Sequence, residues 1–459
     1  MSDETTTLLI FGASGDLTSR LLLPGLGTLL AVEPERKVRV VGAAREAISK
    51  QEWHDKVRTA MESAELPEER IEQLLTSAVY YQADVLQQEE LDSVLADLEG
   101  PIVMYFALPP QISIKLSALL EKMDLPADTR LALEKPFGHD PESAAEFNAQ
   151  LLRVVPESHI HRVDHFIGVA TVLNLMGVRF ANRLMEPIWN SEHIERVDIN
   201  YDETLALEGR AGYYDGAGAL KDMTQSHLLQ IMAFFAMEAP ARLTADEVQS
   251  LKAQVLRATS LWNEDPAVSS RRARYNAGTV DGKEIPDYSS EEGVDPSRET
   301  ETLAEIVVGI DNARWKNVPF VLRSGKALGE VSKEIIVTFR APRHLPLGLK
   351  DNNQPDRLIL QLKPGAVTLE LAINAQGDPF ALEQKSLSAE LGKARMLPYG
   401  EVLGGIMDGN ALLSIRGDVA EECWRIVDPV LKAWSAGDVP LQEYPAGSDG
   451  PEGWGVIPD

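Results

Sequence analysis

The feature that most constrains the fold is a short apolar strand followed at once by a glycine turn. Leu8-Leu9-Ile10-Phe11 is typical of a strand buried on both faces, and Gly12-Ala13-Ser14-Gly15-Asp16-Leu17 follows before helical spacing resumes at Leu22. Exposed N–H groups and a helix dipole at such a turn suit a pyrophosphate. The pattern is G-x-x-G and lacks the full dinucleotide fingerprint, so a tight turn without a ligand is the alternative.

Further strands alternate with helical stretches in the first part of the chain. Apolar runs predict strands at 38–42, 102–107 and 130–133. Strands alternating with helices favour an α/β fold with a doubly wound, Rossmann-type parallel sheet. We place this nucleotide-binding domain at residues 1–165.

The remainder of the chain has a different character. After a helical region at about 169–182, longer strands are expected at 197–201, 305–310, 334–339, 358–362 and 367–374. Few helices separate the later strands, which favours antiparallel pairing. The sequence therefore predicts an α+β domain with a large, mostly antiparallel sheet at residues 166–459. Residues 280–300, rich in Asp, Glu, Ser and Pro, are the best candidate for a mobile loop, although we favour a solvated connection there.

Composition excludes several classes of function. The 459 residues contain 44 Lys and Arg against 71 Asp and Glu, a net charge of −27 that repels nucleic-acid phosphates and anionic lipids. No apolar run has membrane-spanning length, and the polar amino terminus lacks an export signal. The single cysteine, Cys423, forms no internal disulfide and no zinc cluster of the usual kind. We expect a cytoplasmic protein without a metal, nucleic-acid or membrane partner.

The end of the second strand indicates which nicotinamide nucleotide binds. NAD sites usually place Asp or Glu there, whereas Val41-Gly42-Ala43-Ala44-Arg45 offers a neutral turn and then a guanidinium. Arg45 suits a 2′-phosphate and predicts NADP. A solvated surface arginine is the alternative.

Two histidines lie beside acidic residues, in Arg162-Val163-Asp164-His165-Phe166 and in Asp222-Met223-Thr224-Gln225-Ser226-His227. A carboxylate aimed at an imidazole fixes its tautomer and raises its basicity, as proton abstraction from an alcohol requires. A helix cap or buttress is the alternative for each histidine. At about 100° per residue, Asp222 cannot share the helical face of His227, so it must lie at or before the first turn if both reach one ligand.

The motifs resemble those of the glucose-6-phosphate dehydrogenase family, and the matches extend from one end of the chain to the other. Besides the glycine turn and both histidine segments, they are Glu134-Lys135-Pro136-Phe137-Gly138, Arg179-Phe180-Ala181-Asn182, Gly212-Tyr213-Tyr214-Asp215, Arg314-Trp315 with Val318-Pro319-Phe320, and Arg323-Ser324-Gly325-Lys326. The resemblance implies a Rossmann coenzyme domain, a large mixed-sheet domain, a homodimer or homotetramer, and hydride transfer from C1 of a pyranose to NADP⁺, which yields a 1,5-lactone.

The resemblance also implies roles for individual residues. His227 resembles the general base, Asp164 the carboxylate that orients it, and Lys135 the lysine between sugar and coenzyme. The residues matched to the sugar site are His165, Glu203, Asp222 and Lys326. The residues matched to the coenzyme site are Gly12, Ser14, Gly15, Asp16, Leu17, Arg45, Tyr105 and Lys135.

Departures from the family pattern concentrate where the family binds the 6-phosphate. The family's Tyr-Leu-Gly-Lys is Phe166-Ile167-Gly168-Val169 here, an expected lysine is Leu21, and the basic residue expected five positions after Lys326 is Val331. Charge-assisted hydrogen bonds contribute about 1.5–3 kcal/mol each, so losing two or three costs about 3–9 kcal/mol. That corresponds to a factor of roughly a hundred to a few million in affinity.

Three explanations of these departures remain open. Lys333 or Lys363 could replace the missing cations, which gives an ordinary glucose-6-phosphate dehydrogenase of the pentose phosphate pathway. Alternatively, Phe166, Val169 and Val331 form an apolar wall for an unphosphorylated or modified C6 group, the hypothesis we favour from the sequence. The third explanation is a catalytically silent NADP-binding paralogue, which the retained His227 and Asp164 argue against.

Overall fold

The computed structural model describes residues 4–166, 168, 170–209, 211–350, 353–392 and 394–457, and it divides into two compact units. Unit 1 comprises Met1–Ala170, Pro240–Ser250 and Lys393–Glu421, and unit 2 comprises Thr171–Ala239, Leu251–Gly392 and Glu422–Asp459. The chain thus contributes three segments to unit 1, whereas the sequence analysis divided it once, after residue 165. The use of the two units as coenzyme and substrate domains stays a prediction.

Unit 1 is built on a seven-stranded sheet in the order β3-β2-β1-β4-β5-β6-β18. All neighbours pair in parallel except β18, which is antiparallel to β6. The strands are β1 (Thr6–Phe11), β2 (Val38–Ala44), β3 (Val79–Gln82), β4 (Ile102–Phe106), β5 (Arg130–Glu134), β6 (Ile160–Val163) and β18 (Ser414–Ile415). The strand order reverses between β1 and β4, the point at which doubly wound folds bind nucleotides. The predicted Rossmann-type sheet is confirmed.

Helices cover both faces of this sheet, since every residue of β1 and β4 is buried. They are η1 (Thr18–Leu22), α1 (Leu23–Val32), α2 (Lys50–Ser63), α3 (Glu68–Ser77), α4 (Gln88–Leu95), α5 (Pro110–Leu120), α6 (Pro141–Val154), η2 (Glu157–His159), α12 (Pro398–Met407) and η7 (Ala411–Leu413). The apolar core joins side chains of α1, α2, α3 and α12 to one sheet face. Gly25 permits the close approach of α1 to α12, because a Cβ there would lie 2.6 Å from the Tyr399 Cβ.

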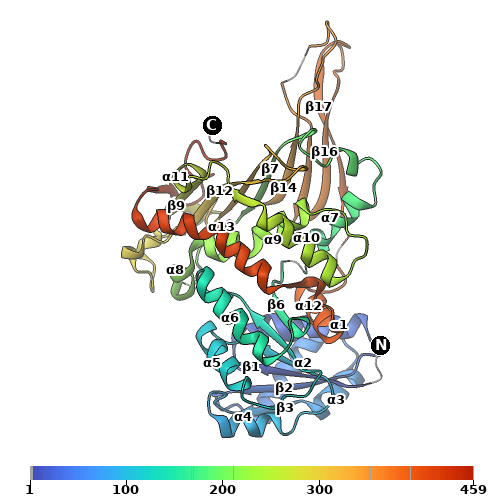
Figure 1. Ribbon diagram of the computed structural model, residues 1–459, viewed down its shortest axis with the longest axis vertical. Helices are drawn as coiled ribbons and strands as arrows, with labels where there is room; N and C mark the ends of the chain where they lie inside the picture. Colours follow the sequence, from blue (N-terminus) through green and yellow to red (C-terminus); the bar gives the residue numbers. More distant parts are fainter. Residues whose placement is uncertain are drawn as a thin grey trace. The chain divides into compact units, whose positions relative to one another are not determined.

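Unit 2 contains a ten-stranded sheet in the order β17-β16-β15-β14-β7-β13-β12-β9-β19, with β8 paired to β12. Only β7 with β13 and β9 with β19 pair in parallel among the described neighbours. The strands are β7 (Ile194–Asp202), β8 (Thr259–Leu261), β9 (Ser270–Asn276), β12 (Leu303–Ile310), β13 (Pro319–Gly325), β14 (Ser332–Phe339), β15 (Arg357–Leu362), β16 (Gly365–Asn374), β17 (Leu382–Glu390) and β19 (Leu441–Pro445). The β16–β17 hairpin extends well beyond its neighbours (Figure 1). The predicted large, mostly antiparallel sheet is confirmed.

Most remaining helices belong to unit 2, and the division between the units falls within α10 and α13. They are α7 (Ala170–Phe180), η3 (Glu186–Ile188), α8 (Ala211–Ala219), η4 (Leu220–Leu228), α9 (Leu229–Ala236), α10 (Ala245–Arg257), α11 (Pro266–Ser269), η5 (Tyr288–Ser290), η6 (Pro296–Arg298) and α13 (Gly417–Ala436). η4 is a π-helix that leads directly into α9, in which every residue is buried.

Residues 280–300, for which the sequence favours a solvated connection over a mobile loop, are partly regular and partly buried. This stretch contains η5, η6 and part of the small hairpin of β10 (Gly278–Val280) and β11 (Lys283–Ile285). Tyr288 is fully buried, and its hydroxyl donates to Asp215 at 2.9 Å. Asp215 also accepts from the Asp295 N–H and the Arg298 guanidinium, each at 3.0 Å. Residues of this polar stretch thus donate hydrogen bonds to the buried carboxylate of Asp215, a contact that composition alone does not reveal.

Among the helices of the described ranges, none combines the length and the apolar character that a bilayer crossing requires.

Candidate active site

The glycine turn joins β1 to η1 at the point where the strand order reverses. Gly12 has φ of +81°, and a Cβ there would lie 2.2 Å from the Ala107 carbonyl oxygen, so the close approach to the end of β4 needs glycine. The Gly12 N–H donates to Ala43 O at 2.8 Å, which fixes the turn to the end of β2. Gly15 and Asp16 are exposed at the start of the helical segment. This exposed backbone fits a pyrophosphate, as the sequence predicts.

A carboxylate that the sequence analysis overlooked lies beside this turn. Glu46 follows the exposed Arg45 and accepts a hydrogen bond from the Ser14 hydroxyl at 2.7 Å, which lowers the pKa of Glu46. Lys56 on α2 donates to Ser14 O at 3.0 Å and to Ser19 Oγ at 3.2 Å. The end of β2 is therefore not a neutral turn followed by one cation, because an acid and a second cation accompany Arg45.

Tyr105 was expected to line the coenzyme site, but the structure places it in the interior of unit 1 with no exposed surface. Its hydroxyl donates to Glu134 at 2.5 Å, and the Tyr399 hydroxyl donates to the same oxygen at 3.1 Å. Burial raises the pKa of Glu134 to about 6, although both tyrosines oppose the shift. Tyr105 thus supports the residue that precedes Lys135, which is half-buried at the end of β5.

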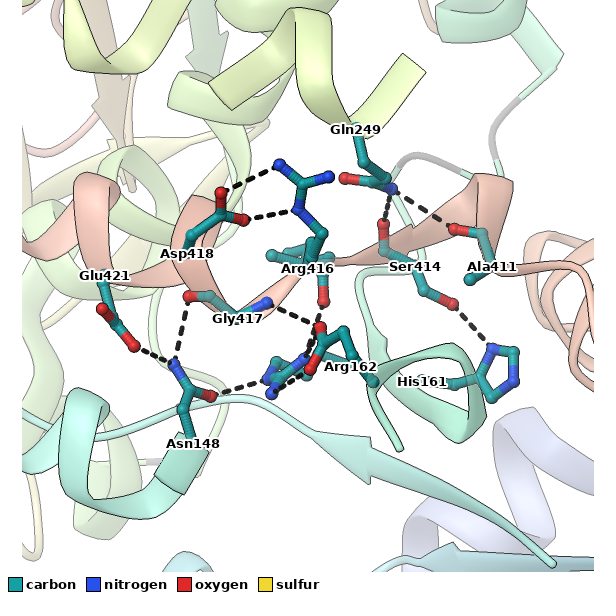
Figure 2. A network of polar contacts seen from close by, with 12 residues as sticks. Asn148, His161, Arg162, Gln249, Ala411, Ser414, Arg416, Gly417, Asp418 and Glu421 are labelled. Carbon is teal, nitrogen blue, oxygen red and sulfur yellow. Dashed lines mark hydrogen bonds and ion pairs between the residues drawn. The ribbon is translucent and has the colours of Figure 1, made fainter. Parts of the chain in front are cut away.

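A buried polar network holds β6, the strand that ends next to Asp164 and His165 (Figure 2). The fully buried Arg162 donates to Glu157 at 2.7 Å and to Asn148 at 2.9 Å. Asn148 in turn donates to Gly417 O at 3.0 Å, at the start of α13. A segment from far along the chain therefore fixes one side of β6.

The histidine within β6 is part of the same support. The His161 ring contacts the Ser414 hydroxyl at 2.9 Å on β18, as Figure 2 shows. Burial lowers the pKa of His161 to about 3, so its imidazole is neutral at physiological pH. Because it is neutral, this histidine anchors the strand without placing a charge in the interior.

Asp164, His165 and Phe166 form a tight turn after β6. Asp164 is buried and accepts the Phe166 N–H at 2.9 Å. The His165 ring stacks on Tyr399, with centroids 5.4 Å apart and planes 14° apart, and it meets the Phe166 ring edge-on at 4.8 Å. Tyr399, which sequence reasoning missed, therefore links His165 to Glu134. Val169 lies outside the described residues.

In unit 2, two lysines share the carboxylate of Glu203. Lys326 donates to one oxygen at 3.0 Å, and Lys333 donates to the other at 2.8 Å. Lys333 lies opposite Tyr201 in the β14–β7 register, with its ammonium 4.3 Å from that ring centroid. Burial opposes ionisation of Glu203, but the two lysines outweigh it and lower the pKa of Glu203. Lys333 is one of the two replacement cations considered from the sequence; the other, Lys363, is exposed between β15 and β16.

Asp222 and His227 both lie on η4. Asp222 is in its first turn, as the sequence argument required, and the Tyr213 hydroxyl donates to it at 3.2 Å. The buried His227 follows five residues later. The statement that the two cannot share a helical face assumed the 100° per residue of an α-helix, and this premise does not apply to η4, because η4 is a π-helix with i→i+5 hydrogen bonds. Spacing of apolar residues gives no signal for this change of period.

Each unit therefore gathers part of the predicted site. Unit 1 holds the glycine turn, Arg45, Lys135, Asp164 and His165, whereas unit 2 holds Glu203, Asp222, His227 and Lys326. The pairing of Asp164 with His227 joins residues of different units and stays a prediction. Within unit 2, a buried imidazole, two carboxylates and two ammonium groups provide the acceptors and donors that a polyhydroxylated anion requires.

Comparison with known proteins places both units in one family. Residues 9–174 match the family model described as "Glucose-6-phosphate dehydrogenase, NAD binding domain", and residues 176–456 match "Glucose-6-phosphate dehydrogenase, C-terminal domain". Two similar relatives, both called glucose-6-phosphate 1-dehydrogenase, come from Gluconobacter oxydans and Treponema pallidum. They are 39% and 35% identical, over 98% and 97% of this chain and 95% and 92% of theirs.

Solved structures agree with this assignment. A glucose-6-phosphate dehydrogenase in complex with its substrate glucose-6-phosphate has a TM-score of 0.86 at 28% identity, covering 99% of this chain and 97% of that one. The enzyme from Mycobacterium avium has a TM-score of 0.82 at 31% identity, covering 97% and 96%. With both units matched over nearly their full length, the chain belongs to the glucose-6-phosphate dehydrogenase family, whose members are NADP-dependent oxidoreductases acting on a CH–OH group.

Proposed function

We propose that this protein oxidises glucose 6-phosphate at C1 with NADP⁺ and releases the 1,5-lactone. The observation that carries the substrate assignment is the Lys326–Glu203–Lys333 cluster, because two ammonium groups on one carboxylate leave one net positive charge. That charge suits an anionic sugar. The relatives named glucose-6-phosphate 1-dehydrogenase support the same substrate.

In this proposal His227 takes the proton of the C1 hydroxyl, and Asp164 orients the imidazole and stabilises it when it becomes charged. Glu203 and Asp222 accept hydrogen bonds from ring hydroxyls, and the lysines keep Glu203 ionised for this role. Lys135 lies between the sugar and the coenzyme. NADP⁺ supplies the acceptor for the C1 hydride.

The residues at the coenzyme turn are suited to NADP. Gly12 and Gly15 lack side chains and let a pyrophosphate approach the backbone of the turn, and Ser14 offers a hydroxyl beside it. The exposed Arg45 is available to the 2′-phosphate. Leu17 and Asp16 begin the helical segment whose dipole favours the same anion.

The hypothesis of altered C6 recognition becomes the second candidate function. Its support is the apolar Phe166 and the 53% exposed Val331, at positions where the family pattern has polar or basic residues. The relatives and the Lys333 ammonium favour the ordinary phosphorylated substrate instead. A sugar with an uncharged C6 group would be the substrate under this second candidate.

A substrate panel tests the proposal. The kcat/KM values for glucose 6-phosphate, glucose and 6-deoxyglucose are measured with NADP⁺ by NADPH absorbance. We expect glucose 6-phosphate to be preferred by roughly a thousandfold or more, the scale of two to three charged contacts. A preference for an unphosphorylated sugar would favour the second candidate, and NADP⁺ binding without reduction by any aldose would favour a silent paralogue.

The assembly is a further proposal. The family resemblance leads us to propose a homodimer or homotetramer, which light scattering of the purified protein would distinguish from a monomer.

A further inference from the structure

Glu301 is a buried carboxylate of unit 2 to which the sequence analysis gave no role. It lies just before β12, is 7% exposed, and accepts the Leu220 N–H through Oε1 at 2.9 Å. Its backbone carbonyl accepts the Ala219 N–H at 3.3 Å. Leu220 is the first residue of η4, the segment that carries Asp222 and His227. Glu301 therefore satisfies N–H groups at the start of this segment, where a negative charge is also favoured by the helix dipole.

The chain is shaped to admit this carboxylate. Gly218, two residues before η4, has φ of +70° and ψ of 172°, a conformation that interrupts α8 one residue before its end. A Cβ at Gly218 would lie 2.3 Å from Glu301 Oε1. Glycine is therefore required both by the backbone angle and by the carboxylate packed against it.

The next residue connects the same strand to the lysine cluster. Thr302 O accepts the Lys326 N–H at 2.9 Å. The Thr302 hydroxyl contacts the Tyr444 hydroxyl at 2.9 Å, and Tyr444 donates to Lys326 O at 2.6 Å. From adjacent positions, Glu301 thus bonds to the start of η4, and Thr302 bonds to the Lys326 N–H directly and is linked to the Lys326 carbonyl through Tyr444.

We propose that Glu301 is a positioning residue: it fixes the start of η4 so that His227 and Asp222 keep their register with Lys326 and Glu203. This inference rests on the proposed function for its catalytic consequence. The geometric consequence, an anchored η4, can be measured without any substrate.

The charge state of Glu301 gives the proposal a pH signature. Burial raises the pKa of Glu301 to about 7, although the Leu220 N–H, Lys221 and Arg272 oppose the shift. The neighbouring Tyr214 and Tyr288 stay neutral, since burial and nearby acids including Glu301 raise the pKa of each phenol. Protonation of Glu301 below about pH 7 weakens its bond to Leu220, so the acid limb of the kcat profile should contain a second ionisation besides that of His227.

The test compares Glu301→Gln with Glu305→Gln. Glu305 is a second buried carboxylate on β12, but it bonds to the Gly455 N–H and Arg271. We expect Glu301→Gln to lower kcat by about 10- to 100-fold, as for a small displacement of a catalytic group, and to reduce the acid-limb slope toward one. For Glu305→Gln, kcat should stay within twofold of the wild-type value, and the slope of the acid limb should be unchanged. NADP⁺ affinity by calorimetry should be unchanged in either variant.

Hydrogen exchange of the η4 amides tests the anchoring role of Glu301 independently of the proposed oxidation of glucose 6-phosphate. Faster exchange at η4 in Glu301→Gln, with wild-type circular dichroism, supports the anchor even if the wild type oxidises no sugar. Wild-type exchange at η4, or a wild-type kcat profile in an enzyme that does oxidise glucose 6-phosphate, overturns the positioning role. Should Glu301→Gln fail to fold, Glu301→Asp keeps the charge and shortens the reach, and the same exchange measurement decides.

Discussion

Replacing Lys333 with methionine removes one of the two ammonium groups that share Glu203. The Lys333 side chain is 12% exposed and the Glu203 side chain 19%, so water compensates only in part for the lost bond. Methionine keeps an unbranched apolar stem against the Tyr201 ring. The net charge of the cluster falls from one positive charge to zero, while Lys326 still holds Glu203 at 3.0 Å.

The magnitude follows from one charge-assisted contact. At about 1.5–3 kcal/mol, its loss corresponds to about a 10- to 150-fold decrease in kcat/KM for glucose 6-phosphate. We expect most of this decrease in kcat/KM to come from a higher KM, because the ammonium binds an anion that is present in the ground state and the transition state alike. For glucose, which carries no phosphate, the decrease should be less than about threefold.

The assay is steady-state NADPH formation with both sugars. Lys316→Met serves as the matched control, since Lys316 is 61% exposed and pairs with Asp311 at 2.5 Å on the surface. Its kinetics should match those of the wild type. Equal decreases in kcat/KM with both sugars would show that Lys333 acts only by orienting Glu203. An unchanged KM for glucose 6-phosphate would refute the assignment of Lys333 to binding of the phosphate.

Three further predictions concern the other parts of the site. Glu46→Gln should tighten NADP⁺ binding and weaken NAD⁺ binding by roughly two- to fivefold each, because an exposed carboxylate beside Arg45 repels a 2′-phosphate and accepts from a ribose hydroxyl, and unchanged calorimetric affinities would contradict this effect. His227→Asn should lower kcat by orders of magnitude without changing NADP⁺ affinity, and comparable turnover would exclude it as the base. Because burial raises the pKa of Glu134 to about 6 in the folded state, its ionisation destabilises the fold at pH 7 and this cost disappears as the pH falls below about 4.5. Glu134→Gln should therefore stabilise the protein by about 1–2 kcal/mol at pH 7 and not at pH 4, measured by urea denaturation, whereas a pH-independent effect would contradict the shift.

The parts of the fold that the sequence predicts correctly are those fixed by local pattern. The strand at Leu8–Phe11 and the glycine turn are contiguous, and the position of Gly12 against Ala107 follows from their place in a parallel sheet. The support of β6 is different, because Arg162 contacts Ile415 and Asn148 contacts Gly417, each more than 250 residues away. No periodicity within either segment encodes such a pairing.

The π-helix shows a second limit of local patterns. From Leu220 to Leu228 the residues have ordinary helical character, and a period of 3.6 separates Asp222 from His227. The start of this π-helix is preceded by Gly218 at positive φ and is bonded to Glu301, 81 positions away. A tertiary contact of this kind leaves no signal in the local spacing of apolar residues.

Two glutamates of the candidate site show why residue type alone does not assign a chemical role. Glu134 ends β5, Glu203 directly follows β7, and both side chains are half-buried. Tyrosine hydroxyls contact Glu134, and they do not offset burial, so its pKa rises. Ammonium groups contact Glu203 and reverse the effect of burial, so its pKa falls. At pH 7 the ionised form is therefore favoured more strongly for Glu203 than for Glu134. The opposite shifts reflect what the partners on other elements can offset: the hydroxyl of Tyr399 on α12 does not outweigh the burial of Glu134, whereas the ammonium of Lys333 on β14 helps to outweigh the burial of Glu203.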